Sequence, residues 1–263
     1  MKVLAVETAT AWQSVALLDE STVLGREDQE ATGAHGAHLL PAISRLMADA
    51  GLSFTQLDGL VCSMGPGSFT GLRVGMATLL GVRAATGVPL VLVPTLEAMA
   101  WSIRSLSGPI CPVLPSRKDE LYWAVFRWGT DGLIERLVPE QVGSPRMLAQ
   151  TLVGTTTMLG DGWTMMEPAI RSALVAGTSV VSAAGDVSRP SAVAVGLAGI
   201  ERLRRGDVAR DPVAPLYVQR TEAEIRYEQS GGVSPVARRQ ARVASKTAAR
   251  AAHRPRTTGR KHD

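Results

Sequence analysis

The sequence predicts an α/β protein with two lobes and mixed sheets, followed by a basic C-terminal tail. Short apolar runs of strand length alternate with stretches of helical periodicity over residues 1–108, and the same alternation recurs more loosely over 109–229. From residue 230 onward large apolar side chains become rare, and such a segment cannot bury a core. We therefore expect an N-terminal lobe at 1–108, a C-terminal lobe at 109–229 and a disordered basic tail at 230–263.

The first lobe opens with three short strands, expected at residues 2–6, 14–18 and 22–25, and a helix at 32–50 follows them. This order resembles the start of a lobe of the actin, sugar-kinase and Hsp70 (ASKHA) type. In such folds the first turn, with Asp and Gly, wraps a nucleotide phosphate. Here Glu7 and Ala9 stand in that turn. Because a methyl group occupies a place where backbone would approach phosphate, we expect no strong ATP binding at this turn.

A glycine-rich helix is the most informative part of the first lobe. An apolar strand at 57–64 ends in the breaker Gly-Pro-Gly at 65–67, and Ser68 is a suitable N-cap for a helix that runs to about residue 86. Gly67, Gly71 and Gly75 recur every fourth residue, so they share one stripe of this helix. Each glycine in a helix interior costs roughly 1 kcal/mol relative to alanine, so some close approach must compensate.

Three interpretations of the glycine stripe are open. The loop before the helix could bind phosphate at the helix N-terminus, although no Walker A lysine follows it. The glycines could serve packing inside the chain. We favour the third interpretation, in which a partner helix packs against the stripe, and we expect Gly75→Leu to abolish pairing while the chain stays folded.

The remaining elements complete the two lobes. The first lobe ends with a strand at 89–93 and a helix at 94–103, and Gly108-Pro109 marks the boundary. In the second lobe we expect strands at 110–114, 121–128, 133–138, 157–159 and within 175–183, a helix at 145–152, and a loop at 160–162. A last helix starts at Pro190-Ser191, and one of its faces carries Val193, Leu197, Ile200 and Leu203.

The charge of the chain is unevenly distributed. The net charge is +4, but residues 235–263 contain nine Lys and Arg and one acid, so that tail carries +8 and the rest −4. The tail is therefore expected either to attract nucleic-acid phosphates or to be a solvated appendage.

Cys62 and Cys111 lie in apolar runs and are expected to be buried thiols. We find no signal-peptide pattern and no apolar run long enough to span a membrane, so a cytoplasmic protein without membrane contact is expected.

A catalytic constellation is not recognisable in the sequence. There is no Gly-x-Ser-x-Gly, His-Glu-x-x-His or Cys-x-x-Cys motif, and His35 and His38 lack further metal ligands nearby. We therefore expect no catalytic residue, no cofactor and no metal. Arg117, Glu120 and Tyr122 are candidates for the lobe junction, where they would line a cleft or form a surface ion pair.

The stretch Gly65-Pro-Gly-Ser-Phe-Thr-Gly-Leu-Arg-Val-Gly75 resembles the signature of the TsaB (formerly YeaZ) family. Similar segments include the opening turn at 4–10, the helix at 38–43, the element at 116–122 and the closing Pro215-Leu-Tyr217, so the resemblance covers residues 1 to about 225. Two departures are Glu7 in place of the common Asp, and Pro115 where Asp is usual.

The resemblance implies an ASKHA fold without catalysis of its own. Such proteins pair with the catalytic subunit TsaD, which, with the ATPase TsaE, modifies tRNAs reading codons that begin with A. Threonylcarbamoyl is placed on the adenosine beside the anticodon. The pairing uses two helices, here 39–50 and 68–85. The interface residues implied are His38, Leu39, Ile43, Leu46, Met47, Gly67, Gly71, Leu72, Val74, Gly75, Thr78 and Leu79, and the structural signature loop is Gly65, Pro66, Gly67, Ser68, Phe69 and Thr70.

Other functions remain open at this point. The chain could be an ATP-dependent ASKHA transferase or kinase, or a glycopeptidase-like hydrolase, with a site between the lobes. A homodimer is expected when the chain is alone, because an uncovered apolar face is a liability. Contact with tRNA is expected to be indirect, or to run through the basic tail.

Overall fold

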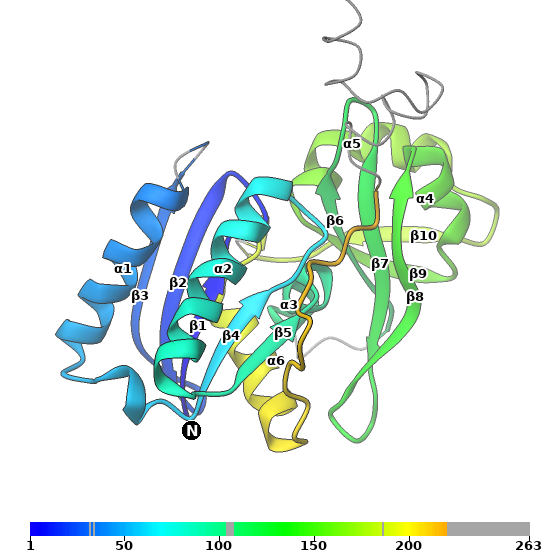
Figure 1. The fold of residues 1–263 in the computed structure, drawn as a ribbon. Coiled ribbons are helices and arrows are strands. Elements are labelled where there is room, and N and C mark those ends of the chain that lie inside the picture. The colour runs from blue at the N-terminus through cyan, green and yellow to red at the C-terminus, as the bar shows by residue number, and fades with distance from the viewer. Residues whose placement is uncertain (32, 34, 104–107, 186, 220–263) are drawn as a thin grey trace, which may run out of the picture. The chain divides into compact units, whose positions relative to one another are not determined.

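The computed structural model describes residues 1–31, 33, 35–103, 108–185 and 187–219 (Figure 1). The chain divides into two compact units, Met1–Val218 and Gln219–Asp263. The expected basic tail lies outside the described residues. Met1–Val218 contains two five-stranded mixed sheets with helices packed on them, which confirms the predicted α/β class.

The first sheet has the strand order β3-β2-β1-β4-β5. Its strands are β1 (Lys2–Glu7), β2 (Trp12–Asp19), β3 (Thr22–Glu30), β4 (Gly59–Ser63) and β5 (Leu90–Val93). The hairpin-connected strands β1, β2 and β3 are antiparallel, whereas β4 and β5 extend the sheet in parallel from β1. The strand β3 runs five residues beyond its predicted end, because it keeps pairing with β2 as far as Glu30.

The second sheet repeats this topology. Its strands are β6 (Ile110–Pro115), β7 (Leu121–Trp128), β8 (Ile134–Gly143), β9 (Thr155–Leu159) and β10 (Ser179–Ser182). The order β8-β7-β6-β9-β10 corresponds strand by strand to the first sheet, again with three antiparallel strands followed by two parallel ones. The chain therefore uses one strand arrangement twice.

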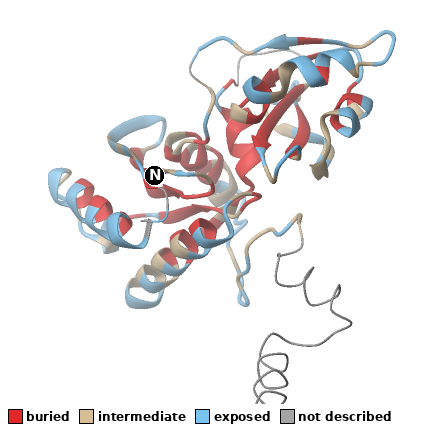
Figure 2. Ribbon diagram, turned by 90° about the horizontal axis from the view of Figure 1, so that it is seen from above, coloured by how far each residue is buried: buried red, intermediate tan, exposed pale blue. Residues whose placement is uncertain are grey.

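Helices cover both faces of the first sheet (Figure 1). α1 (His35–Asp49) and α2 (Phe69–Thr86) lie on one face, and α6 (Ala192–Arg204) lies on the other. The short helix α3 (Thr95–Trp101) contacts both α6 and the second sheet, and α4 (Pro145–Thr151) and α5 (Asp161–Ser172) cover that sheet's other face. Figure 2 shows the buried residues on the strands and on the inner sides of the helices. A 3-10 turn, η1 (Phe54–Gln56), precedes β4.

One prediction of local structure is wrong. The Gly-Asp-Gly stretch at 160–162 is not a loop, because α5 begins at Asp161. Gly162 is needed inside that helix, since a Cβ atom there would lie 2.7 Å from the backbone of Leu114. The predicted apolar face of α6 packs on the first sheet: Ile200 is buried, and Val193, Leu197 and Leu203 are half-buried against the same cluster. Gly196 and Gly199 bring this helix close to the sheet.

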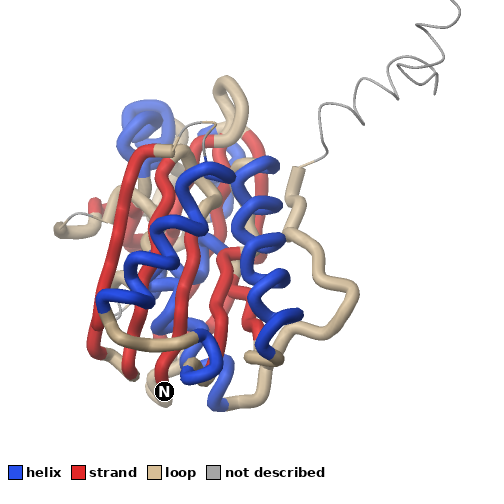
Figure 3. The backbone as a smooth tube through the Cα atoms, turned by 60° about the vertical axis from the view of Figure 1, so that its left-hand side comes forward, coloured by secondary structure: helices blue, strands red, loops and turns tan. Residues whose placement is uncertain are grey.

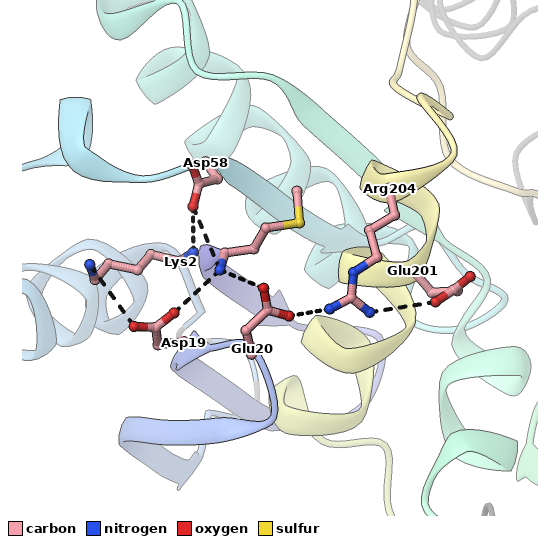
Figure 4. A network of polar contacts seen from close by, with 7 residues as sticks. Lys2, Asp19, Glu20, Asp58, Glu201 and Arg204 are labelled. Carbon is pink, nitrogen blue, oxygen red and sulfur yellow. Dashed lines mark hydrogen bonds and ion pairs between the residues drawn. The ribbon is translucent and has the colours of Figure 1, made fainter.

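Ion pairs hold the start of β1 to the end of α6 (Figure 4). The amino group of Met1 lies 2.8 Å from a carboxylate oxygen of Glu20 and 3.3 Å from one of Asp19. Glu20 in turn pairs with Arg204, whose other nitrogen lies 3.7 Å from Glu201. The β2–β3 turn is thereby fixed to two distant parts of the chain.

Among the described residues, no helix has the length and apolar character needed to cross a membrane.

Candidate functional site

The signature loop connects β4 to α2 and packs against the turn between β1 and β2. Ser68 is the N-cap of α2, as predicted: its Oγ accepts a hydrogen bond from the amide of Gly71 at 3.2 Å. The amide of Ser68 donates to the carbonyl oxygen of Ala9 at 2.6 Å. The loop therefore fixes the start of α2 to the first turn of the chain.

The glycine row, with Gly67 just before α2 and Gly71 and Gly75 inside it, faces this same turn and the end of β1. A Cβ atom on Gly67 would lie 2.2 Å from the carbonyl oxygen of Ala9, and one on Gly75 would lie 2.4 Å from the Oγ1 of Thr8. Internal packing therefore accounts for these glycines, and the expectation that the row receives a partner helix is corrected. Gly75→Leu would clash inside the chain, so it cannot serve as a clean test of pairing.

Several residues expected at the interface lie in the core instead. Six of them are buried beneath their helices: Leu39, Ile43, Leu46 and Met47 of α1, and Leu72 and Leu79 of α2. All but Leu72 belong to the cluster that packs on the first sheet, and Leu72 is itself only 1% exposed. Their apolar periodicity marks the inner faces of the helices. In this conformation they support an outer surface and do not reach a partner.

The outward sides of α1 and α2 form a separate surface. His38 is exposed, and Val74 and Thr78 are half-buried. We call a set of six residues on this side the outer α1–α2 face: Leu40, Pro41, Ser44, Val74, Ala77 and Gly81. Leu40 is 52% exposed, and a Cβ atom on Gly81 would meet no heavy atom within 4 Å. Figure 3 shows the two helices side by side in front of the first sheet.

A hollow lies at the end of this face where both helices begin. Its volume is about 330 Å³, and its lining is Thr10, Ala11, Gly33, Gly36, Ser68, Thr70 and Val74. Two residues of the signature loop, Ser68 and Thr70, are among these. The hollow is thus continuous with α2 and with the first turn of the chain.

The first turn is occupied by hydrogen bonds within the chain. The amide of Ala9 donates to the carboxylate of Glu7, and Thr8 Oγ1 donates to the carbonyl oxygen of Gly71 at 2.9 Å. Burial raises the pKa of Glu7 to about 7, and the bond from Ala9 offsets part of this effect. Because the amide of Ala9 is already used, the turn offers less to a phosphate than a glycine-containing turn does.

The three lobe-junction candidates lie in the β6–β7 turn and in the strand that follows it. Arg117 and Glu120 belong to the turn between β6 and β7, where the amide of Glu120 donates to the carbonyl oxygen of Arg117 at 3.0 Å. Tyr122 follows in β7 and is buried in the cluster that α3 forms with the second sheet. Within the described ranges, no group of three or more His, Cys, Asp or Glu residues is placed to hold a metal ion.

The interface residues implied by the resemblance do not include Ala77 and Gly81, which are exposed on α2. Ala77 and Gly81 carry no charge or aromatic ring, so nothing but their place on the helix distinguishes them. The small residues of this helix continue past Gly75 with Ala77 and Gly81, which are exposed whereas Gly71 and Gly75 are buried. Tyr217 was noted for its motif, but its contact with Arg73 was not predicted.

The duplicated strand order, with helices packed on both sheets, is that of a two-lobed ASKHA-type protein. The family model described as "TsaD: tRNA N6-adenosine threonylcarbamoyltransferase" matches residues 28–227. The chain belongs to the TsaB (YeaZ) family, within the wider set of proteins that this model describes.

Individual relatives agree with this placement. The tRNA threonylcarbamoyladenosine biosynthesis protein TsaB of Bacillus subtilis is 28% identical over 88% of this chain and 99% of its own length. The protein of the same name from Escherichia coli is 30% identical over 62% of this chain and 72% of its own. The solved structure of YeaZ from Pseudomonas aeruginosa is 25% identical, with a TM-score of 0.68 over 82% of this chain and 99% of that one.

Proposed function

We propose that this chain acts in tRNA threonylcarbamoyladenosine biosynthesis as a non-catalytic subunit that pairs with, and activates, a TsaD-like transferase subunit. The names of its curated relatives support the pathway, and the match to the TsaD family model supports a related fold on both sides of the pair. The chemical step, threonylcarbamoyl transfer to the adenosine beside the anticodon of tRNAs reading A-starting codons, belongs to the partner in this proposal.

The observation that carries the proposal is the open space around Gly81. A glycine within a helix costs roughly 1 kcal/mol relative to alanine, and here no contact within the described chain explains it. Ala77, one turn earlier, is also exposed and small. Small residues let a second helix approach closely, and Leu40 and Pro41 of α1 add apolar area beside them. A two-helix surface of this kind fits two helices from a partner.

The test is the dissociation constant for the TsaD-family subunit of the same organism, measured by calorimetry with the full chain. Gly81→Leu should raise the constant about tenfold or more, because the new side chain occupies the approach path. Ala169→Leu adds bulk on the exposed side of α5 and is the matched control, expected to bind like wild type. Equal binding by wild type and Gly81→Leu would contradict the placement of the interface, and no binding by wild type would contradict the pairing.

The non-catalytic assignment rests on the first turn and on the sequence. Ala9 takes the place of a glycine, its amide is bonded to Glu7, and no nucleophile or metal-ligand motif is recognisable. An ATP-dependent transferase or kinase, or a glycopeptidase-like hydrolase, is therefore the weaker alternative. Calorimetry with ATP decides: micromolar binding with turnover by the isolated chain would favour an enzyme.

The proposal extends to assembly and location. In the cytoplasm the pair would be joined by a TsaE-like ATPase, and in the absence of the partner two copies of this chain would use the same outer α1–α2 face. Sedimentation of the isolated chain tests the second point: Gly81→Leu should shift a dimer toward monomer. A dimer unaffected by Gly81→Leu would show that self-association uses another surface.

The basic residues 235–263 are proposed to attract tRNA to the complex. Their charge of +8 contrasts with −4 for the rest of the chain, and neutralised phosphates make such binding strongly salt-dependent. Removing residues 235–263 should lower the tRNA affinity of the pair and flatten its dependence on salt. An unchanged salt slope would assign these residues no part in tRNA binding.

A further inference from the structure

Arg73 lies in a small aromatic cluster near the start of α2. Its guanidinium carbon is 3.7 Å from the ring centre of Phe69 and 6.0 Å from that of Tyr217. Its Nε donates a hydrogen bond to the hydroxyl oxygen of Tyr217 at 3.0 Å, and the two rings are 5.3 Å apart. One ring face and one hydrogen bond therefore fix the guanidinium plane.

The position of Tyr217 is itself fixed by the segment that precedes it. Residues 207–218 run beside α2 (Figure 3), where the amide of Ala209 donates to Leu90 and the amide of Leu216 donates to Met64, each at 2.7 Å. Between these two points Asp211 pairs with Arg83 of α2 at 3.3 Å. Three separate contacts thus hold the segment that places the tyrosine against Arg73.

Arg73 differs from Arg83 in its ionic environment. α2 contains these two arginines and no acidic residue. Arg83 has Asp211 as its carboxylate partner, whereas Arg73 contacts no carboxylate in the part of the chain that the structure describes. With its Nε bound to Tyr217, the terminal nitrogens of Arg73 remain as donors. A held, planar guanidinium suits bidentate binding of a carboxylate, with little further loss of side-chain entropy.

We propose that Arg73 is a recognition residue that binds a carboxylate side chain of the partner subunit. This inference rests on the proposed pairing through the outer α1–α2 face, which Arg73 adjoins on α2. The aromatic neighbours favour a protein carboxylate over an RNA phosphate. Phe69 is 38% and Tyr217 is 43% exposed, and exposed aromatic rings around an arginine are typical of the centre of a protein interface. Phosphate binding usually recruits several cations. The second arginine of α2 is Arg83, which already pairs with Asp211.

The experiment measures binding of the full-length chain to the TsaD-family subunit of the same organism, at low and high salt. Arg73→Gln should raise the dissociation constant about tenfold or more and flatten its salt dependence, as expected for a lost charge-assisted contact. Arg73→Lys keeps the charge but loses the planar fork, so it should also bind several-fold more weakly. Tyr217→Phe removes the hydroxyl that orients Arg73 and should give a smaller loss.

Arg45→Gln is the matched control, because Arg45 is an exposed helix arginine that pairs with Glu27 of the same chain. It should bind within about twofold of wild type, and melting curves should show that all variants are folded. Binding of Arg73→Gln that equals wild type would overturn the inference while leaving the pairing intact. A loss of tRNA affinity with unchanged subunit affinity would overturn it in favour of a phosphate contact. If the wild-type chain does not bind the subunit, the pairing and this inference both fail.

Discussion

A Cβ atom on Gly71 would lie 2.0 Å from the carbonyl oxygen of Thr8. The same threonine donates its hydroxyl hydrogen to the carbonyl oxygen of Gly71. Helix α2 and the end of β1 therefore meet backbone to backbone at this point. The contact explains why a helix that could gain stability from alanine keeps a glycine there.

Gly71→Ala should destabilise the chain by about 2 kcal/mol or more, because backbone atoms must move to admit the methyl group. Gly81→Ala is the internal control on the same helix: with open space around it, this substitution should stabilise the chain by up to about 1 kcal/mol. Urea unfolding of both variants measures the two changes. Opposite signs are expected, and a neutral Gly71→Ala would contradict the packing described for the glycine row.

The glycine row also shows what the sequence could and could not predict. The position of α2, its N-cap Ser68 and the spacing of its glycines follow from local rules and are confirmed. The direction in which the row faces does not follow, because helical periodicity groups residues on a stripe without saying what that stripe contacts. In α6 a similar limit applied: Gly199 is pressed against Val61, so small residues mark its buried face. The segment that leads to Tyr217 could not be predicted either, since its bonds reach residues more than a hundred positions away.

The stability of the chain should depend on pH through Glu7. The ordinary pKa of this carboxyl is 4.5, and burial raises it to about 7 in the folded chain. The folded state therefore holds a proton that the unfolded state releases, so the stability that Glu7 contributes is complete below pH 4.5. It should fall by about 3 kcal/mol as the pH rises from 4.5 through 7, and then level off.

Glu7→Gln should remove this dependence, so that the variant gains stability over wild type at pH 8 but not at pH 5. Urea midpoints at the two pH values give the comparison. Glu30→Gln, which changes an exposed carboxyl at the end of β3, is the control and should leave the wild-type pH dependence in place. If wild type is no less stable at pH 8 than the Glu7→Gln chain, Glu7 is ionised at little cost and the expectation is wrong.

The two cysteines should be unreactive in the folded chain. Cys62 and Cys111 are both fully buried, and burial raises the pKa of each thiol well above its usual value. Since the thiolate is the reactive form, a neutral-pH thiol reagent such as Ellman's should modify neither residue without unfolding. In urea both should react. Rapid modification of one thiol under native conditions would mean that its strand opens locally.

Glu97 joins α3 to two other elements through ion pairs. Its carboxylate is 9% exposed and accepts hydrogen bonds from Arg202 of α6 at 2.9 Å and from Arg136 of β8 at 3.1 Å. Glu97→Gln keeps the size of the side chain but removes the negative charge between the two arginines, of which Arg202 still pairs with Asp207 and Arg136 with Glu140. Removing one partner of a buried ion pair costs about 3–5 kcal/mol, and since Arg136 is 38% exposed we expect a smaller loss of about 2 kcal/mol here. Glu167→Gln breaks a surface pair with Arg171 on α5 and should cost less than about 0.5 kcal/mol. Urea unfolding measures both losses. If the two variants lose comparable stability, solvent screens the Glu97 pairs as well, and apolar packing alone fixes α3 between α6 and the second sheet.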